Sequence, residues 1–472
     1  MSETICDGQQ AARRSGPSVG CLLRAEILCA LAAFAVLCVA VLTAAPQLVE
    51  PDDYAYRASI IALSDGYPLT LSTAQASALA AQLTHAGGGQ VLAGPGPLGD
   101  GIEQWVRLPD GRWISQKDPG HPFLAAPFQA LGIIRLAPLF YGALGCLGLF
   151  FGARRWLGRY GGAAAVGLFC SSGAALLFAW RDYMPTFTDA SLIAAGTGAL
   201  LWVLMAGEAA ARRRRWAGLL GFLAIEAAVF VRYTDIVVLG CAVLAVLAVR
   251  WRRPASVPPG AAGWWLGSVA VFGAGVAVFD DLVYGGPFRS GYPPGEITFS
   301  LGAVGPNLRN MPAHLLQAMP MVLLGLLALA WIPARWAILR RASRERGASE
   351  QARAVSLDVA VGLALAASWF SVWGLYAAYT WTTTPGLSSL QAVRFYLPAI
   401  GAISLLGAWL VARLPLRASL APVTTAAVVT AAFGLGIWSF TSMRTCPFTG
   451  ICVQGHLPPT VQAAAWLAGS GS

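Results

Sequence analysis

Charged residues are scarce in this 472-residue chain. Asp, Glu, Lys and Arg make up only 11% of the residues, whereas hydrophobic residues make up 57%. Soluble globular proteins carry about 25% charged residues, so the composition excludes an ordinary soluble protein of two or three domains. Lysine is almost absent, since Lys117 is the only one. The sequence also lacks Cys-x-x-Cys pairs and His/Cys metal-ligand spacings, which excludes the common zinc-site patterns.

Long apolar runs recur along the whole chain, and the mean hydropathy is +0.62. An apolar helix of about 20 residues is long enough to cross the hydrocarbon core of a bilayer. The sequence therefore predicts an all-α polytopic membrane protein with about eleven transmembrane helices. The spans are expected at approximately 27–49, 131–153, 161–180, 189–208, 216–232, 235–250, 264–284, 316–337, 356–380, 396–412 and 421–441.

Positive charge is unevenly distributed between the loops. Of the 32 basic residues, 21 fall in segments that the predicted spans place on the same side as the N-terminus. Short cytoplasmic loops of membrane proteins are enriched in Lys and Arg. We therefore expect the N-terminus inside and the C-terminus outside. The net charge of +10 reflects this topology rather than binding of nucleic acid.

The expected organisation has three parts. Residues 1–26 form a cytoplasmic N-terminal tail, residues 27–442 a transmembrane domain with the large outer loop 50–121, and residues 443–472 an outer C-terminal tail. The first span resembles a signal peptide in its flanking arginines, but its long apolar run favours an uncleaved anchor. In the outer tail, Cys446 and Cys452 either form a short disulfide loop or remain free, and the sequence leaves both possibilities open.

The first outer loop contains most of the polar sequence. Residues 51–64 and 72–85 favour helices, the first of which would lie along the membrane surface. Alternating side chains on both sides of Pro109-Asp110-Gly111 predict a small β-hairpin. The hairpin would return the chain to the membrane at Lys117. Two further outer loops are expected, at 285–314, where Gly and Pro residues indicate irregular backbone rather than helix, and at 381–394.

Three carboxylates lie at expected outer ends of spans. Asp52 and Asp53 follow the first span, and Asp189 begins the fourth. Each has a structural alternative as a helix N-cap, a position that Asp favours. Charged groups at the edge of a span are costly, which also makes them functional candidates. Two adjacent carboxylates allow one to accept a proton while the other orients a metal or a phosphate.

Basic side chains accompany these carboxylates on the outer face. Lys117 follows the predicted hairpin, while Arg232 and Arg394 lie at outer ends of spans. Long basic side chains at such positions often extend to lipid headgroups, and this is the structural alternative. An ammonium or a guanidinium at the mouth of a membrane cavity also suits a lipid-linked phosphate.

The order of these motifs resembles that of the membrane glycosyltransferases of the C-type fold. The similarity is to the bacterial branch related to protein O-mannosyltransferases and aminoarabinose transferases, and it extends over about residues 25–415. The chain departs from that family's pattern at Asp53, where many relatives have Glu, and after Lys117, where many have Pro-Pro. The matching segments are 51–56, 117–122, 188–189, 284–292 and 394–398.

The resemblance implies a glycosyltransferase on the outer face of a bacterial plasma membrane. It would move a sugar, with inversion, from a polyprenyl-phosphate donor to a glycan, lipid or protein acceptor. The implied catalytic residues are Asp52 as the base, Asp53 and Asp189. The implied donor phosphate ligands are Lys117, Arg394, Arg232 and Arg289. Residues expected to shape the substrate site are Tyr56, His121, Gly291 and Tyr292.

A divalent metal is a further possibility. Asp52 and Asp189 supply hard oxygen ligands, which favour Mg²⁺ or Mn²⁺. Two other functional classes stay open, a transporter or flippase of lipid-linked or amphipathic solutes and a non-catalytic scaffold. The large loop between the first two spans and the lack of a two-fold hydropathy repeat favour the enzyme over the transporter.

Overall fold

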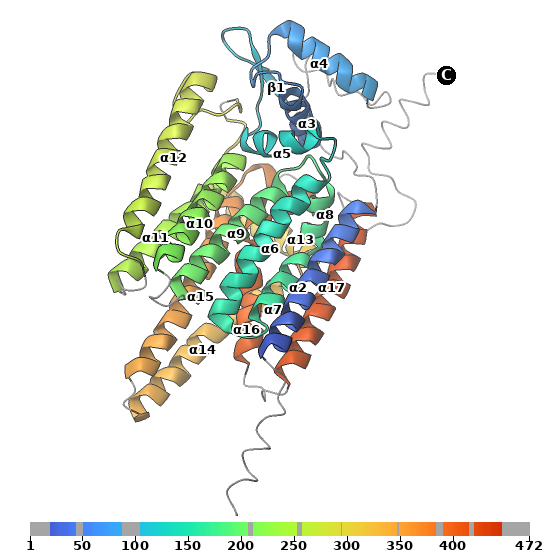
Figure 1. Cartoon of the computed structure of the whole chain (residues 1–472). Coiled ribbons are helices and arrows are strands. Elements are labelled where there is room, and N and C mark those ends of the chain that lie inside the picture. The colour runs from blue at the N-terminus through green and yellow to red at the C-terminus, as the bar shows by residue number, and fades with distance from the viewer. Residues whose placement is uncertain are drawn as a thin grey trace, which may run out of the picture.

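The computed structural model describes residues 19–43, 51–86, 104–205, 211–252, 257–293, 295–346, 349–383, 390–414 and 420–445. These residues form a bundle of long helices with a small layer of short elements over one end (Figure 1). The α-helices and strands are α2 (Val19–Leu42), α3 (Pro51–Ser64), α4 (Thr73–Ala86), β1 (Trp105–Arg107), β2 (Trp113–Ser115), α5 (Gly120–Ala130), α6 (Leu136–Leu157), α7 (Gly161–Cys170), α8 (Gly173–Trp180), α9 (Thr186–Met205), α10 (Ala211–Val231), α11 (Ile236–Arg252), α12 (Ala261–Tyr284), α13 (Leu301–Ala318), α14 (Val322–Arg346), α15 (Ser349–Ala377), α16 (Ile400–Arg413) and α17 (Ala421–Thr445). The short 3₁₀ segments are η2 (Tyr233–Asp235), η4 (Trp381–Thr383), η5 (Leu390–Phe395) and η6 (Leu397–Ala399).

Many of the helices are long and apolar enough to cross a membrane. Seven satisfy this by length and composition among the described residues, or up to nine if the bent pairs α7–α8 and α13–α14 each count as one span. Within the described residues, every predicted span overlaps a helix or a bent helix pair of the bundle. The polytopic helical fold is thus confirmed, while the count of eleven and the inside–outside orientation stay predictions.

Helices α6 and α9 are in close backbone contact. A Cβ atom added to Gly148 would lie 2.6 Å from the Cα of Ala195, and one added to Gly145 would lie 3.0 Å from the carbonyl oxygen of Ser191. Only glycine allows the two backbones to approach this closely. The contact fixes the start of α9, which lies next to the cavity described below.

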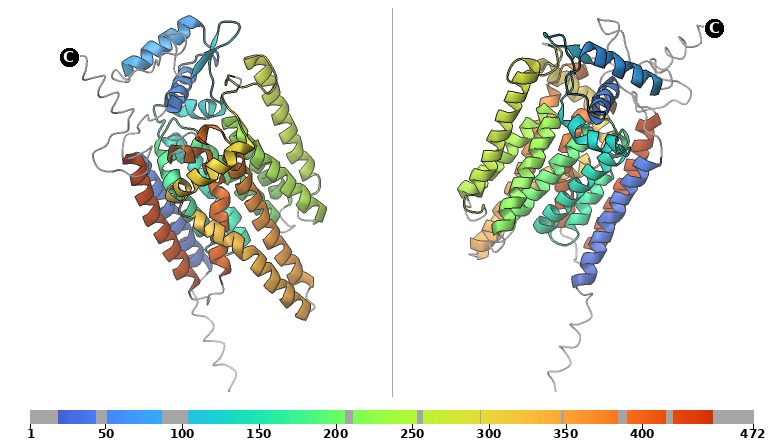
Figure 2. Two further views of the ribbon diagram at one scale, coloured as in Figure 1. Left: turned by 180° about the vertical axis from the view of Figure 1, so that it is seen from behind. Right: turned by 45° about the horizontal axis from the view of Figure 1, so that its top comes forward.

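The layer over the end of the bundle comes from the long segment between α2 and α6, the predicted first outer loop (Figures 1 and 2). Helices α3 and α4 and the antiparallel pair β1–β2 enclose a small apolar core that includes Leu71, Leu79 and Trp105. The Asp-Gly turn is formed with Gly111 at φ +87°, a conformation that side chains rarely adopt. The two helices and the hairpin are therefore confirmed, while the placement of the first helix along the membrane surface stays a prediction. Because of the turn, the chain returns toward the bundle at Lys117.

The prediction of irregular backbone throughout 285–314 is wrong in its second half. Helix α13 occupies 301–318 despite Pro306 and Pro312, each of which removes only one backbone donor. Its buried residues Ala303, Asn307, Met311 and Leu315 recur every four positions, so one face packs against the bundle. That packing outweighs the two prolines. Cys446 and Cys452, for which the sequence left a disulfide and free thiols open, fall outside the described residues.

Candidate active site

A cavity of about 270 Å³ lies between the layer of short elements and the end of the bundle. Its walls come from α3, the β2–α5 link, the start of α9, the α10–α11 junction, the loop before α13, the end of α15, and η4 and η5. Six residues predicted for the site line it: Asp52, Tyr56, Lys117, Arg232, Tyr292 and Arg394. The fold thus gathers residues from widely separated segments into one space.

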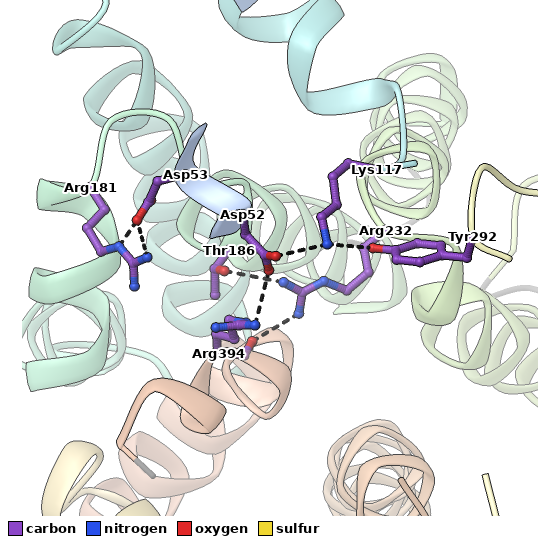
Figure 3. Close-up of polar contacts among 8 residues, drawn as sticks. All are labelled: Asp52, Asp53, Lys117, Arg181, Thr186, Arg232, Tyr292 and Arg394. Carbon is purple, nitrogen blue, oxygen red and sulfur yellow. Dashed lines mark hydrogen bonds and ion pairs between the residues drawn. The ribbon is translucent and has the colours of Figure 1, made fainter. Parts of the chain in front are cut away.

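Asp52 lies between two cations. Its Oδ1 is 2.9 Å from the Nζ of Lys117, and its Oδ2 is 3.0 Å from an Nη of Arg394 (Figure 3). Lys117 also donates to the hydroxyl of Tyr292 at 3.2 Å, and its Nζ lies 5.0 Å from the centre of that ring. Asp52 is in the first turn of α3, where the helix dipole favours a carboxylate.

The two cations set the charge of Asp52. Burial alone would raise the pKa of its carboxyl group, because it disfavours the charged form. Lys117 and Arg394 outweigh that effect and hold the pKa of Asp52 below its ordinary value. The cavity therefore contains an ionised carboxylate whose two oxygens are both engaged.

Asp53 points away from the cavity. It pairs with Arg181 at the end of α8, whose Nε lies 3.2 Å from its Oδ1 and whose Nη2 makes a second contact to Oδ2 (Figure 3). Successive residues of a helix face different directions, so the adjacent carboxylates separate. Asp53 fastens α3 to the bundle, whereas Asp52 faces the open space.

Asp189 is buried behind the cavity rather than in its lining. Its Oδ2 is 3.8 Å from the Nε of Arg232, and Arg232 donates to the carbonyl oxygen of Arg394 at 2.9 Å and to the hydroxyl of Thr186 at 3.2 Å. Asp189 is the fourth residue of α9, so the N-cap alternative is wrong for it. The side chain instead orients Arg232, which in turn holds the backbone of Arg394.

The residues present do not fit the predicted Mg²⁺ or Mn²⁺ site between Asp52 and Asp189. Both oxygens of Asp52 contact cations, and Arg232 stands beside Asp189. A metal ion there would meet the repulsion of several positive groups. Among the described residues, no three or more His, Cys, Asp or Glu side chains group closely enough to hold a metal.

The remaining predicted residues are placed differently. His121 is buried edge-on to the ring of Tyr56 at 5.7 Å, and burial lowers its pKa to about 3, so it is neutral. Gly291 permits a close approach, since a Cβ there would lie 2.8 Å from the carbonyl oxygen of Ser115. That contact brings Tyr292 next to Lys117. Arg289 is exposed and does not belong to the cavity lining.

Asp118 is a lining residue that we did not predict for the site. It accepts a hydrogen bond from the backbone N–H of Tyr233 at 3.3 Å. Burial raises its pKa to about 7, against the opposing effects of that hydrogen bond, Arg232 and Lys117. Asp52 and Asp118 therefore line one cavity in opposite electrostatic environments, and Glu296 is a third carboxyl group in the lining. The sequence did single out this position, because Asp118 stands where the chain departs from the family pattern after Lys117.

Aromatic rings form another unpredicted part of the wall, contributed by Tyr376, Tyr379, Trp381 and Phe395. The guanidinium of Arg394 lies 4.8 Å from the ring centre of Phe395 and 5.6 Å from that of Trp381. Cations are attracted to aromatic faces, so the rings help to fix Arg394. The wall joins apolar surface to a few oriented polar groups, as small-molecule sites do.

No protein-family model and no curated protein matches the chain in sequence. Two solved structures resemble its fold. The crystal structure of ArnT from Cupriavidus metallidurans in the apo state has 17% sequence identity and a TM-score of 0.49, covering 92% of this chain and 66% of that one. ArnT bound to undecaprenyl phosphate has 15% identity and a TM-score of 0.47, covering 91% and 72%.

ArnT is an aminoarabinose transferase of the C-type glycosyltransferase fold. At such identity the likeness concerns the fold alone. The chain spans just under two thirds of the length of the apo ArnT chain. What the cavity does has to follow from this chain's own residues.

Proposed function

We propose that the protein transfers a sugar from a polyprenyl-phosphate donor to an acceptor hydroxyl at the membrane surface. One observation carries this proposal: Asp52, Lys117 and Arg394 meet in a single cavity at one end of a membrane bundle. Glycosyl transfer from a phosphate needs a base for the acceptor and positive charge for the departing group. The cavity supplies both.

The same two cations would serve Asp52 and the donor at different stages. A bound phosphate carries negative charge and would compete with Asp52 for Lys117 and Arg394. Those contacts are what lower the pKa of Asp52. Their transfer to the phosphate would raise that pKa and make Asp52 a stronger base. Donor binding would thus prepare the site for the acceptor.

In the proposed reaction, the acceptor oxygen attacks the anomeric carbon while its proton passes to Asp52. The bond between the anomeric carbon and the phosphate oxygen breaks, and its electron pair leaves with the lipid phosphate. Lys117 and Arg394 balance the charge that develops there. Because attack and departure occur on opposite sides of one carbon, the configuration inverts.

The proposal includes a location, with the cavity facing outward from a bacterial plasma membrane. It rests on the uneven distribution of arginine between the two sides of the spans. Ser77 is exposed on α4 and Trp251 is exposed at the opposite end of the bundle, so Ser77→Cys and Trp251→Cys form a matched pair. In a variant without native cysteines, an impermeant thiol reagent should label only Ser77→Cys in intact cells. The reverse pattern would place the cavity inside.

The activity itself is tested with purified protein and synthetic polyprenyl-phosphate sugars, using a panel of hexoses and pentoses with envelope glycans, lipids and peptides as acceptors. We expect a glycosylated product together with free polyprenyl phosphate in equal amounts. Wild-type protein in sealed vesicles provides the competing measurement. Movement of the intact lipid-linked sugar across the membrane, without transfer, would identify a transporter instead.

A further inference from the structure

Two apolar furrows lie side by side on the membrane-facing surface, toward the end of the bundle away from the cavity. The first, of about 790 Å³, runs between α2 and α6. The second, of about 830 Å³, is bordered by α6, α9 and α10. Leu147, Phe151 and Trp202 line both and form the ridge between them. Figure 1 shows these helices next to one another across the front of the bundle.

The furrows exist because small residues leave space beside large ones. Gly148, Gly198 and Ala199 line the second furrow, where α6 and α9 are in backbone contact. The ridge residues Leu147 and Phe151 are about half exposed, at 52% each. A surface with such relief offers more contact to an acyl chain than a flat helix face does.

Each furrow has a pair of arginines at the same end. Arg154 and Arg155 line the first, and Arg212 and Arg213 line the second. Arg155 donates from Nε to the carbonyl oxygen of Met205 at 3.0 Å, which holds it near the end of α9. Of these four arginines, only Arg154 has a carboxylate partner among the described residues, the buried Glu26. The two furrows therefore end in excess positive charge.

We propose that this surface binds an anionic lipid with two phosphates in one headgroup, of the diphosphatidylglycerol type. Basic residues next to apolar grooves between membrane helices select anionic headgroups. The ridge separates two chain-binding furrows, and each has its own arginine pair. A lipid with two phosphates and two pairs of chains matches both features at once, with its headgroup crossing the ridge.

The proposed lipid would add contacts to α2, which is little buried within the protein. Only 22% of the apolar span of α2 is buried within the protein, against 72% for α9. A lipid that fills the first furrow covers α2 and α6 together, and one that also reaches the second furrow joins them to α10. The lipid would therefore stabilise the attachment of α2. This inference does not depend on the proposed glycosyltransferase activity.

The test measures lipid retention by delipidated, purified protein with native mass spectrometry and thermal unfolding. The probes are cardiolipin, phosphatidylglycerol with one phosphate, and zwitterionic phosphatidylcholine. We expect one retained cardiolipin that raises the unfolding temperature. The Arg155→Gln/Arg212→Gln double variant should bind it roughly tenfold more weakly. Arg250→Gln, at the end of α11 outside both furrows, is the matched control and should bind as the wild type does.

Several outcomes would overturn the proposal. Equal retention of cardiolipin and phosphatidylcholine would show that the furrows do not select charge. Equal stabilisation by phosphatidylglycerol would remove the requirement for two linked phosphates. Unchanged binding by the double variant would remove the arginines from the site. If the double variant does not fold, Arg213→Gln provides the same measurement, with a smaller expected loss.

Discussion

The two ends of the bundle contain the same arrangement, one carboxylate between two cations. At the cavity end, Asp52 contacts Lys117 at 2.9 Å and Arg394 at 3.0 Å. At the far end, Asp358 in α15 contacts Arg413 at 3.0 Å and Arg335 at 3.4 Å. Charge and geometry alone do not distinguish the two clusters.

Their surroundings do distinguish them. Asp52 faces a cavity of about 270 Å³, where its partners can turn to another anion. Asp358 lines neither this cavity nor either of the two furrows, and it also accepts a hydrogen bond from the indole of Trp156 at 2.8 Å. Its partners come from α6, α14 and α16. A buried ion cluster becomes a candidate site when it adjoins free space, and otherwise it joins helices.

The largest expected effect comes from Asp52→Asn. The amide keeps the size of the side chain but cannot take the proton of the acceptor hydroxyl, so the transfer rate should fall by a factor of about 10²–10⁴. The measurement is in vitro transfer from a synthetic lipid-phosphate sugar at saturating donor, with expression and thermal stability compared in parallel. If Asp52 served only as a helix cap, Asn would replace it well and the variant would keep nearly full transfer.

Asp53→Asn is the control for this prediction. Asp53 is tied to Arg181 outside the cavity, so its loss should lower stability more than the rate per folded molecule. Transfer by Asp52→Asn close to that of the wild type would show that Asp52 has only a structural role. An inactive but folded Asp53→Asn alone would exchange the roles of the two residues.

Lys117→Ala should have the next largest effect. Loss of one charge-assisted contact to the donor phosphate costs about 1.5–3 kcal/mol, or roughly ten- to a hundredfold in donor use. The transfer rate is measured against donor concentration and, separately, against acceptor concentration. The variant should change the dependence on acceptor less than the dependence on donor. Arg309→Ala, an exposed arginine on α13, is the matched control. Equal donor dependence of Lys117→Ala and the wild type would assign Lys117 to headgroup contacts.

The fold was largely predictable because a helix that crosses a bilayer needs an apolar run of about 20 residues, which is visible in the sequence. Apolar runs marked the bundle helices, and an Asp-Gly turn between alternating segments marked the hairpin. Helix α13 was missed because the Gly and Pro residues of 285–295 suggested irregular backbone for the whole loop. Its four-residue spacing of buried positions was visible, but the packing that outweighs two prolines is a long-range property.

The main charged residues of the site were predictable, but their pairing partners were not. Asp52, Lys117 and Arg394 were identified because each lies where the chain meets the outer membrane surface. Asp118 was not predicted, because the phosphate-binding role in this segment was assigned to Lys117 and the residue after it was noted only as a departure from the family pattern. The pairing of Asp53 with Arg181 and of Asp189 with Arg232 depends on helix rotation and depth, which motif order does not determine.

Asp358→Asn tests the other end of the comparison. Breaking one side of a mostly buried ion cluster leaves arginines without their partner and should cost about 2–3 kcal/mol of unfolding free energy. Thermal unfolding in detergent measures this loss. The transfer rate per folded molecule should stay near that of the wild type, because Asp358 lies at the opposite end from the cavity. A loss of transfer without a loss of stability would make the far cluster part of the reaction.

The smallest expected effect concerns how stability depends on pH. Asp118 and Asp52 line the same cavity, but their carboxyl groups should change the stability in opposite directions as the pH rises. Burial raises the pKa of Asp118 from 3.8 to about 7, so the folded state binds this proton more tightly than the unfolded state does. The resulting stability is fully present below the unfolded pKa and is lost as the pH rises toward about 7. Asp52 has a lowered pKa, so its contribution is present above its unfolded pKa and is lost in acid.

Asp118→Asn should therefore flatten the decline in unfolding temperature between about pH 4 and pH 7, while Asp52→Asn should leave that decline in place. Asp182 has a pKa raised by burial to about 7 as well, against the opposing charge of Arg135, so the single variant should reduce the slope without abolishing it. Adding Asp182→Asn should reduce the slope further. Thermal unfolding across this range measures each slope. An Asp118→Asn slope equal to that of the wild type would mean that the Asp118 carboxyl titrates as it does in the unfolded chain.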